Sequence, residues 1–297
     1  MAAAGRQCRL AAAVDRGNAP AARVWKGVAV MSVLADRFGR RFVYLRLSVT
    51  EACNFRCSYC LPGGHRAQTG TTPALRVDEI ARLLRVLASE GVRKVRITGG
   101  EPTLRRDLCA IIAQAAATPG IRTVALTTNG VLLRKQRLAW QAAGLDALNV
   151  SVDTLDPGRF IAITGDDRLH EILAGIDDAL ADGSLAVKLN AVLLRGLNDD
   201  QLPAFLAYLR RRPVSLRFIE LMQTGDNRAY FERHHHRAAS LEAALLAQGW
   251  QLVPHAVDAG PAREYRHADY AGRVGVIAPY SRDFCASCNR LRITSRG

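Results

Sequence analysis

Short runs rich in Val, Ile and Leu alternate along the chain with longer segments in which apolar residues recur every three or four positions. The short runs have the length and β-branched content of buried strands. We expect six strands, at residues 43–49, 93–98, 122–128, 146–152, 185–194 and 214–221. Strands and helices that alternate in this way predict a parallel sheet with right-handed crossovers. Six such units predict an α/β fold, a partial (β/α)6 TIM-like barrel that is open on one side.

The segments between these runs have the pattern of amphipathic helices. One helical face carries Val77, Ile80, Leu83, Leu84 and Leu87, and Glu90-Gly91 provides a stop signal. Further helices are expected at about 107–117, 132–143, 169–182 and 199–211. Asn198-Asp199-Asp200 is predicted to cap the last of these. Functional residues should lie at the carboxyl ends of the strands, where barrel enzymes place them.

Three regions differ in pattern. Residues 1–30 hold five basic residues and one acid and are rich in Ala, which predicts a disordered extension or a start at Met31. Residues 31–222 form the barrel. After that the rhythm breaks, and residues 223–297 contain one helix at 240–248 and strand-like pieces around 263–279. We expect a small C-terminal subdomain that covers the open side and is truncated at Gly297.

Composition narrows the class of protein. The 297 residues are 49% hydrophobic and 23% charged, so a large core can form and wholesale disorder is excluded. No uncharged apolar run approaches the roughly 20 residues that span a bilayer. Lys and Arg number 41 against 27 acids, a net charge of +14 that favours anionic partners. Without basic patches interleaved with aromatic residues, nucleic acid is not expected among them.

Three cysteines lie on one short loop directly after the first predicted strand: Cys53, Cys57 and Cys60. Three thiolates can each bind one iron of a four-iron cluster, which leaves the fourth iron open to a substrate or cofactor. A structural zinc site, which normally has four ligands, is the alternative. A second pair, Cys285 and Cys288, is a redox pair, half of a metal site or a coincidence. Clustered thiols favour a reducing compartment, so we expect a cytoplasmic protein.

The loop Thr98-Gly-Gly-Glu-Pro102 follows the second predicted strand. Its two glycines allow the backbone to approach a ligand closely, and Glu101 can accept hydrogen bonds from an ammonium group. Thr127-Thr-Asn-Gly130 and Ser151-Val-Asp153 follow the third and fourth strands. All three segments therefore come where the barrel prediction requires functional residues.

Together these motifs resemble the radical S-adenosylmethionine (SAM) superfamily, in which an aromatic residue precedes the last cysteine of Cys-x-x-x-Cys-x-x-Cys. Longer segments, across residues 31–297, resemble the GTP 3′,8-cyclase family of molybdenum-cofactor biosynthesis. These segments are Arg46-Leu-Ser-Val-Thr, Arg96-Ile-Thr-Gly-Gly-Glu-Pro, Leu126-Thr-Thr-Asn-Gly, Asn149-Val-Ser-Val-Asp, Arg217-Phe-Ile-Glu-Leu-Met222 and Phe284-Cys-Ala-Ser-Cys288-Asn-Arg-Leu-Arg292.

The resemblance implies the cofactors and the site residues. A 4Fe-4S cluster would be held by Cys53, Cys57 and Cys60, and SAM by Tyr59, Gly100, Glu101, Ser151 and Met222. GTP would contact Arg46, Arg96, Thr127, Lys188, Arg290 and Arg292. Cations from separate strands suit a triphosphate, because arginine forks match phosphate oxygens. A second 4Fe-4S cluster would be held by Cys285 and Cys288, with a third cysteine that the family places beyond the position of Gly297.

By the same resemblance, the chain would convert GTP to 3′,8-cyclo-7,8-dihydro-GTP, the first step of molybdopterin biosynthesis. A cyclic pyranopterin monophosphate synthase would take up the product, a protein reductant of unknown identity would supply electrons, and a homodimer is left open. Because the third ligand of the second cluster is missing, we expect the sequence as given to cleave SAM without cyclising GTP. The alternatives are a radical SAM peptide-modifying enzyme and a truncated, non-catalytic iron–sulfur or nucleotide-binding relative.

Overall fold

The computed structural model describes residues 34–66, 73–254, 260–282, 284–286 and 288–297, and the predicted extension, residues 1–30 with Met31, lies outside them. Ten strands in this part of the chain form one sheet, in the order β10-β1-β2-β3-β4-β5-β6-β9-β8-β7. The strands are β1 (Tyr44–Ser48), β2 (Lys94–Thr98), β3 (Thr123–Thr128), β4 (Ala147–Ser151), β5 (Ala186–Leu193), β6 (Ser215–Glu220), β7 (Gln251–Leu252), β8 (Arg263–Arg266), β9 (Arg273–Ile277) and β10 (Arg290–Ile293).

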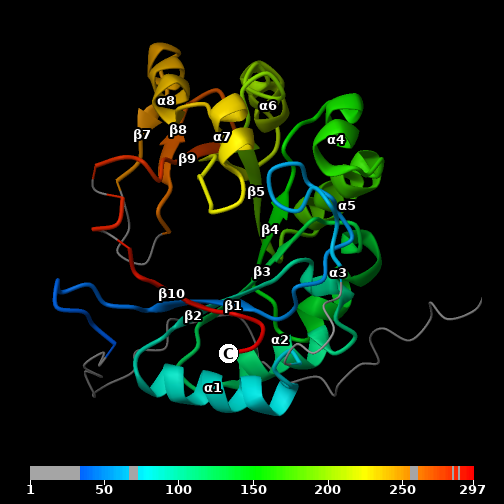
Figure 1. Ribbon diagram of the computed structural model, residues 1–297, viewed down its shortest axis with the longest axis vertical. Coiled ribbons are helices and arrows are strands. Elements are labelled where there is room, and N and C mark those ends of the chain that lie inside the picture. The colour runs from blue at the N-terminus through cyan, green and yellow to red at the C-terminus, as the bar shows by residue number, and fades with distance from the viewer. Residues whose placement is uncertain (1–33, 67–72, 255–259, 283, 287) are drawn as a thin grey trace, which may run out of the picture.

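The six predicted strands are confirmed as β1 to β6, which are neighbours and run parallel. The sheet continues beyond them. Strand β9 pairs in parallel with β6, and β10 pairs in parallel with β1, so segments from the C-terminal region extend both sides of the six-stranded unit (Figure 1). In the described residues the end strands β7 and β10 do not pair with each other, so the barrel is open.

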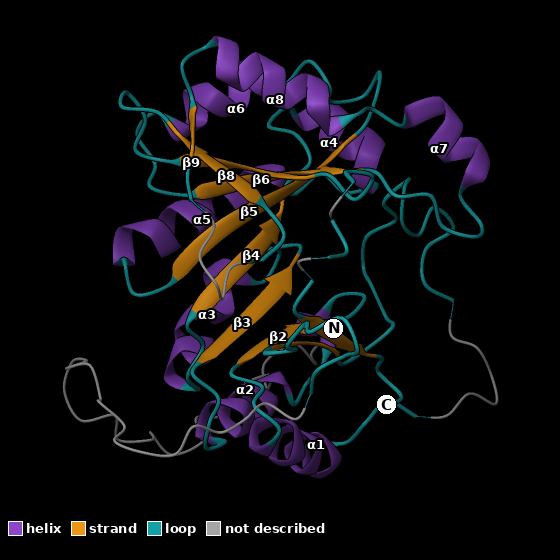
Figure 2. Cartoon of the chain, turned by 90° about the vertical axis from the view of Figure 1, so that its left-hand side faces the viewer, coloured by secondary structure: helices purple, strands orange, loops and turns teal. Residues whose placement is uncertain are grey.

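Helices cover the outer face of the curved sheet (Figure 2). The described helices are α1 (Val77–Ser89), the 3₁₀ turn η1 (Pro102–Leu104), α2 (Leu108–Ala117), α3 (Leu133–Ala142), α4 (Pro157–Thr164), α5 (Leu169–Asp182), α6 (Leu202–Leu209), α7 (Arg228–His234) and α8 (Ala238–Ala247). Of these, α7 lies to one side of the sheet (Figure 2). The short helices α4 and α7 were not predicted. No described helix is long and apolar enough to cross a membrane.

Helix α6 begins later than predicted, and the predicted cap does not form. The residue at its N-terminal boundary is Gln201. The side chain of Asn198 instead serves the turn that leaves β5, because its carbonyl oxygen accepts a hydrogen bond from the backbone N–H of Leu194 at 2.7 Å. A polar side chain that satisfies a buried turn is not available to cap a helix.

Alternation along the strands divides their side chains between two faces. In β1, Leu45 and Leu47 are fully buried in the hydrophobic core. Arg46, on the opposite face, pairs in register with Arg96 of β2 and with Arg292 of β10. Three arginines from neighbouring strands therefore share the inner face of the sheet. Because these arginines are aligned across three neighbouring strands, they form a row of positive charge on that face.

A glycine makes room for a further arginine on this face. Gly275 of β9 lies opposite Arg217 of β6 in the sheet. A Cβ atom at Gly275 would lie 2.9 Å from Cγ of Arg217, which is closer than the two atoms can approach. The absence of a side chain at Gly275 thus allows the Arg217 side chain to lie along the inner face.

Candidate active site

The three-cysteine loop is anchored to helix α4. The backbone N–H of Arg56 donates to the carbonyl of Thr164 at 2.9 Å, and that of Ser58 donates to the carbonyl of Ile163 at 2.8 Å. Phe55, buried between the first two cysteines, packs edge-to-face against Phe160 of α4, with ring centroids 6.0 Å apart. Contacts at both the backbone and the aromatic ring fix the loop at the carboxyl end of β1, as the sequence predicted.

The thiols of this loop have the chemistry that an iron–sulfur cluster needs. Cys53 and Cys57 are half-buried and Cys60 is exposed. Burial raises the pKa of all three thiols, so as free groups they are protonated at neutral pH, whereas coordination to a metal deprotonates a thiol. No three His, Cys, Asp or Glu side chains of the described chain converge on a single ion. A cubane takes each thiolate on a different iron, so the donor set fits it.

The glycine loop after β2 lies directly against the three-cysteine loop. The N–H of Gly100 donates to the carbonyl of Thr50 at 2.8 Å, and that of Glu101 to the carbonyl of Ala52 at 2.7 Å. A Cβ atom at Gly100 would lie 2.3 Å from the carbonyl oxygen of Ala52. Position 100 is therefore occupied by glycine because only a residue without a side chain lets the two backbones approach this closely.

Glu101 is buried and its carboxylate is occupied by hydrogen bonds within the protein. Oε1 accepts from the backbone N–H and hydroxyl of Thr103 and from the hydroxyl of Thr128, and Oε2 accepts from the N–H of Asn129 at 2.7 Å. Burial raises its pKa although these bonds oppose the shift. The carboxylate joins the ends of β2 and β3. Its predicted contact with the SAM ammonium stays a prediction.

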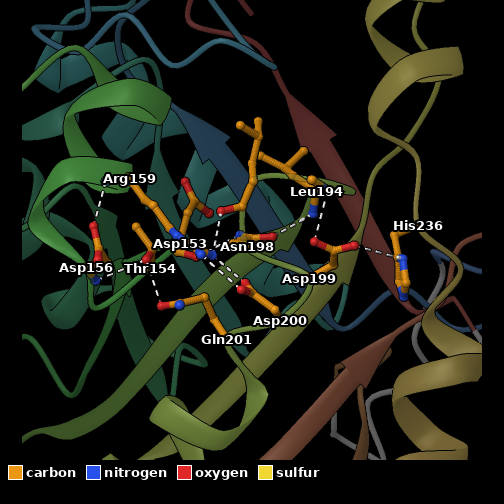
Figure 3. Close-up of polar contacts among 12 residues, drawn as sticks. Asp153, Thr154, Asp156, Arg159, Leu194, Asn198, Asp199, Asp200, Gln201 and His236 are labelled. Carbon is orange, nitrogen blue, oxygen red and sulfur yellow. Dashed lines mark hydrogen bonds and ion pairs between the residues drawn. The ribbon is translucent and has the colours of Figure 1, made fainter.

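A buried carboxylate, Asp153, supports the three-cysteine loop from the other side. The hydroxyl of Tyr59 donates to its Oδ2 at 2.9 Å, and the N–H of Val192 donates to its Oδ1 at 2.7 Å. Burial raises the pKa of Asp153 to about 6. Figure 3 shows Asp153 next to Asn198, whose amide donates to the Asp153 carbonyl at 2.7 Å. The predicted SAM residue Tyr59 is thus held by β4, β5 and the turn after β5.

Helix α7 contacts the same loop. The hydroxyls of Ser58 and Tyr230 are 2.8 Å apart. The far end of the helix is fixed by His235, whose Nε2 lies 2.8 Å from Oε1 of the buried Glu220 at the end of β6. Helix α7 therefore connects the three-cysteine loop to the end of β6. Ser151, the remaining predicted SAM residue, lies opposite Asn190 in the sheet.

A cavity of about 360 Å³ opens on the inner face of the sheet. Six predicted residues line it: Met222 of the SAM set, and Arg46, Arg96, Thr127, Arg290 and Arg292 of the GTP set. Cys288 of the second cysteine pair lines it as well. Other residues that line it were not predicted, among them Tyr44, Asn190, Arg217 and Phe284. Tyr44 could have been predicted, because it lies two residues before Arg46 in the same strand and its side chain therefore faces the same side of the sheet.

Lys188 lies in a neighbouring cavity of about 590 Å³, together with Lys94 and Glu264. Arg217 and Gly260 line both cavities, so the two adjoin. Arg217 is buried and donates from Nη2 to Oε1 of Glu264 at 3.1 Å. The two cavities together bring cations from β1, β2, β5, β6 and β10 to one region.

The cations of this region are poorly compensated within the described protein. Burial, followed by neighbouring positive charges, lowers the pKa of Arg96 to about 10 and that of Lys188 to about 8. The Nε atoms of Arg46, Arg96 and Arg217 are buried without a hydrogen-bond partner among the described residues. Unpaired buried donors and like charges in proximity are costly unless an anion binds between them. The cavity therefore has the chemistry of an anion site.

The second cysteine pair lies at the edge of this cavity and is surrounded by arginines. Although burial opposes the shift, hydrogen bonds from Arg290 and the charges of Arg290 and Arg40 lower the pKa of Cys288. The Nη1 group of Arg40 also donates to the carbonyl oxygen of Cys285 at 2.7 Å. A thiol with a lowered pKa is a better metal ligand, because less work is needed to ionise it.

Comparisons with known proteins agree with this geometry. The family described as "Radical SAM superfamily" matches residues 47–209, and "Molybdenum Cofactor Synthesis C" matches residues 214–297. A GTP 3′,8-cyclase of Stenotrophomonas maltophilia (strain K279a) is 62% identical over 267 residues, which cover 90% of this chain and 82% of that relative. A GTP 3′,8-cyclase of Shewanella denitrificans is 52% identical, with 90% of this chain and 79% of the relative covered.

Among solved structures, Streptococcus suis SuiB bound to S-adenosylmethionine is similar in fold, with a TM-score of 0.58 and 18% sequence identity. The likeness covers 71% of this chain but 48% of SuiB, so the chain spans about half the length of that protein. At this identity the similarity concerns the arrangement of strands and helices alone. It supports the open parallel barrel described above.

Proposed function

Because the chain belongs to the radical SAM superfamily and, within it, to the GTP 3′,8-cyclase family, we propose that its cavity binds GTP and that it converts GTP to 3′,8-cyclo-7,8-dihydro-GTP. This reaction belongs to molybdenum-cofactor biosynthesis, consistent with the second matched family. The identity of 62% over 90% of the chain favours the cyclase over a peptide-modifying enzyme.

One observation carries the proposal: a single cavity is lined by residues assigned to SAM, to GTP and to the second cysteine pair. It is lined at once by Met222 of the predicted SAM site, by Cys288 of the second pair and by five arginines on the inner face, Arg46, Arg96, Arg217, Arg290 and Arg292. Guanidinium groups that converge from different strands suit phosphate oxygens. A nucleoside triphosphate held by them would lie between the two cysteine sites.

The three-cysteine loop would hold a 4Fe-4S cluster through Cys53, Cys57 and Cys60. When bound and reduced, this cluster supplies the electron that cleaves SAM into methionine and a 5′-deoxyadenosyl radical. The protein fixes the loop through the Gly100 backbone contact and the Tyr59 hydrogen bond to Asp153. Tyr59, Gly100, Glu101, Ser151 and Met222 are the residues that we propose for SAM.

Cys285 and Cys288 would provide two ligands of a second 4Fe-4S cluster at the guanine end of the substrate. The lowered pKa of Cys288 supports this role. The cations would hold the triphosphate, with Lys188 and Arg217 on the side of the larger cavity. Their task is placement, because reacting carbons must be held within about 3–3.5 Å of each other while water is excluded.

Four further features belong to the same proposal. The product would be consumed by a cyclic pyranopterin monophosphate synthase, and a reductant protein would supply electrons. Cysteines that bind a cluster must be reduced, which favours the cytoplasm as the location. A homodimer is compatible with this reading, and sedimentation of the cluster-loaded protein would measure the oligomeric state.

The test uses protein reconstituted with iron and sulfide without oxygen, then supplied with dithionite, SAM and GTP. Formation of 5′-deoxyadenosine and of the cyclised nucleotide are measured separately. In a chain that includes the third cysteine of the family, we expect Cys57→Ala to lose both products, and Cys288→Ala to lose the cyclised nucleotide while still forming 5′-deoxyadenosine. A Cys57→Ala protein that still cleaves SAM would refute the role of the three-cysteine loop. Cyclisation by Cys288→Ala at the parent rate would refute the role of the second pair.

A further inference from the structure

A tyrosine is buried among the cations of the cavity. Tyr44 begins β1, is 2% exposed and lines the same cavity as Arg46 and Arg96. In the sheet it lies between Lys94 of β2 and Arg290 of β10. Its backbone N–H also donates to the carbonyl of Asn289 at 3.3 Å. Tyr44 therefore lies where the barrel meets the segment that carries the second cysteine pair.

The ring of Tyr44 contacts two of the cations. The Lys94 ammonium lies 5.0 Å from the ring centroid, and Cζ of Arg96 lies 5.3 Å from it. A cation at such a distance is attracted by the negative face of an aromatic ring, and more strongly when both are buried. Two like charges that would otherwise repel are thus held beside the same ring. The ring prepares them for a ligand that carries more than one negative charge.

The hydroxyl of Tyr44 has no hydrogen-bond partner in the part of the chain that the structure describes. Its oxygen is buried. A buried hydroxyl without a partner costs free energy comparable to a lost hydrogen bond. In a cavity whose neighbouring side chains are donors, the missing partner must be an acceptor. The cations around it select an anionic acceptor.

We propose that Tyr44 is a substrate-binding residue whose hydroxyl donates to a phosphate oxygen of the nucleotide, while its ring positions Lys94 and Arg96 for the same phosphate group. This inference rests on the proposed function, because it takes GTP as the occupant of the cavity. Tyr44 would add an uncharged hydrogen-bond donor to the phosphate site, whereas the residues already assigned to phosphate are cations.

Two substitutions separate the hydroxyl from the ring. Tyr44→Phe removes the hydroxyl alone, and Tyr44→Leu removes the ring as well. The matched control is Tyr208→Phe on α6, because Tyr208 also has a buried hydroxyl without a described partner and has Arg212 4.1 Å from its ring centroid. Tyr208 does not line the cavity. Binding of GTP and of guanosine to the reconstituted proteins is measured by anoxic equilibrium dialysis, and thermal unfolding without nucleotide is recorded.

We expect Tyr44→Phe to weaken GTP binding by at least about 10-fold, the effect of one hydrogen bond to a charged group, and to leave guanosine binding unchanged. Its melting temperature without nucleotide should equal or exceed that of the parent, because an unpaired buried hydroxyl has been removed. If the Tyr44 hydroxyl only stabilised the fold, the substitution would lower this melting temperature instead. Tyr44→Leu should weaken GTP binding further, and Tyr208→Phe should bind GTP like the parent.

Each contrary result has its own meaning. Parent-like GTP binding by Tyr44→Phe would overturn the contact of the hydroxyl with the nucleotide, and an equal loss for guanosine would overturn its assignment to phosphate. Equal affinities of Tyr44→Leu and Tyr44→Phe would overturn the role of the ring. If the parent protein itself does not bind GTP, the proposed function fails, and this inference fails with it.

Discussion

The hydroxyl of Tyr59 donates a hydrogen bond to the buried carboxylate of Asp153 over 2.9 Å. Tyr59 belongs to the three-cysteine loop, and Asp153 follows β4 on the far side of the site. Through this bond a carboxylate buried in the barrel determines where the loop lies between its second and third cysteines. The bond is therefore one of the protein contacts that position the loop.

Tyr59→Phe should lower the free energy of unfolding of the apoprotein by about 1–2 kcal/mol, because the buried carboxylate then loses one of its two donors. Chemical denaturation under reducing conditions measures the change. In the double variant with Asp153→Asn the two effects should not add, since the side chains contact each other directly. As a control, Ser58→Ala, which removes a contact with half-buried Tyr230, should lower the free energy of unfolding by less than Tyr59→Phe does. Additive effects of Tyr59→Phe and Asp153→Asn would contradict the coupling.

Gly100→Ala should prevent the glycine loop from reaching the three-cysteine loop. The new methyl group would lie 2.3 Å from the carbonyl oxygen of Ala52, so one backbone must move, at a cost of about 1–3 kcal/mol. We expect a clear loss of iron bound at the first site after anoxic reconstitution, measured by iron and sulfide analysis. Gly63→Ala is the control, because nothing lies within 4 Å of a Cβ there. Equal iron contents of the two variants would refute the packing argument.

GTP affinity should fall as the pH rises above about 8. Burial and the nearby charge of Arg217 lower the pKa of Lys188 to about 8, so the free protein loses this positive charge in mildly alkaline solution. A triphosphate binds the charged form, so its dissociation constant should rise by up to about tenfold per pH unit from a pH of about 8 up to the higher pKa that Lys188 has beside the bound phosphate. Lys188→Arg should give a flatter profile, because arginine keeps its proton.

The same titration has the opposite effect on stability without nucleotide. Between a pH of about 8 and 10.5 the unfolded chain still holds the Lys188 proton that the folded protein has released, so the contribution of this group to stability rises with pH. Thermal melts of the parent and of Lys188→Met across this range measure the difference. A Lys188→Met protein whose pH dependence matches the parent would contradict the assignment.

Glu264→Gln should strengthen GTP binding and weaken the fold. The carboxylate accepts a hydrogen bond from Arg217 and lies in the cavity beside Lys188, so it competes with an incoming anion for both cations. Glutamine keeps an acceptor but removes the negative charge, and we expect binding tighter by about 3- to 10-fold at low salt. Stability should fall by about 1 kcal/mol, since Arg217 loses its counter-charge.

The control for this substitution is Glu232→Gln on α7, where the carboxylate pairs with Arg228 at an exposed surface. It should change neither quantity, because exposed ion pairs contribute little. Dialysis at two salt concentrations gives the affinities. Weaker GTP binding by Glu264→Gln would mean that the carboxylate orients Arg217 rather than competing for it.

The sequence was sufficient for the six central strands and for the position of both cysteine sites. These follow from local signals: apolar runs of strand length and thiols at fixed spacing. Strands β9 and β10 were not predicted to join the same sheet, because their sequences, Arg-Val-Gly-Val-Ile and Arg-Leu-Arg-Ile, are short and carry arginine at positions that alternate with the apolar ones. Their arginines are there because the inner face of the sheet forms a charged cavity.

Residues that hold site residues in place through hydrogen bonds could not be predicted from local sequence patterns. Asp153 was seen as part of a strand-end motif, but its hydrogen bonds with Tyr59 and Val192 depend on how β4, β5 and the three-cysteine loop meet. Glu264 lies on a short strand far along the chain from Arg217, and nothing in the local pattern connects the two. Such partners are set by tertiary contacts, which a single sequence does not encode in any short window.

The pairing of β10 with β1 has a consequence for how the molecule is made. The neighbours Arg46 and Arg292 are separated by most of the polypeptide. The pairing of β10 with β1 therefore forms slowly, because it joins residues that are far apart in the sequence. During synthesis the three-cysteine loop and the glycine loop against it emerge early, while the nucleotide cavity lacks a wall until residues 290–293 have been translated. Iron delivery to the first site can therefore precede the formation of a place for the substrate.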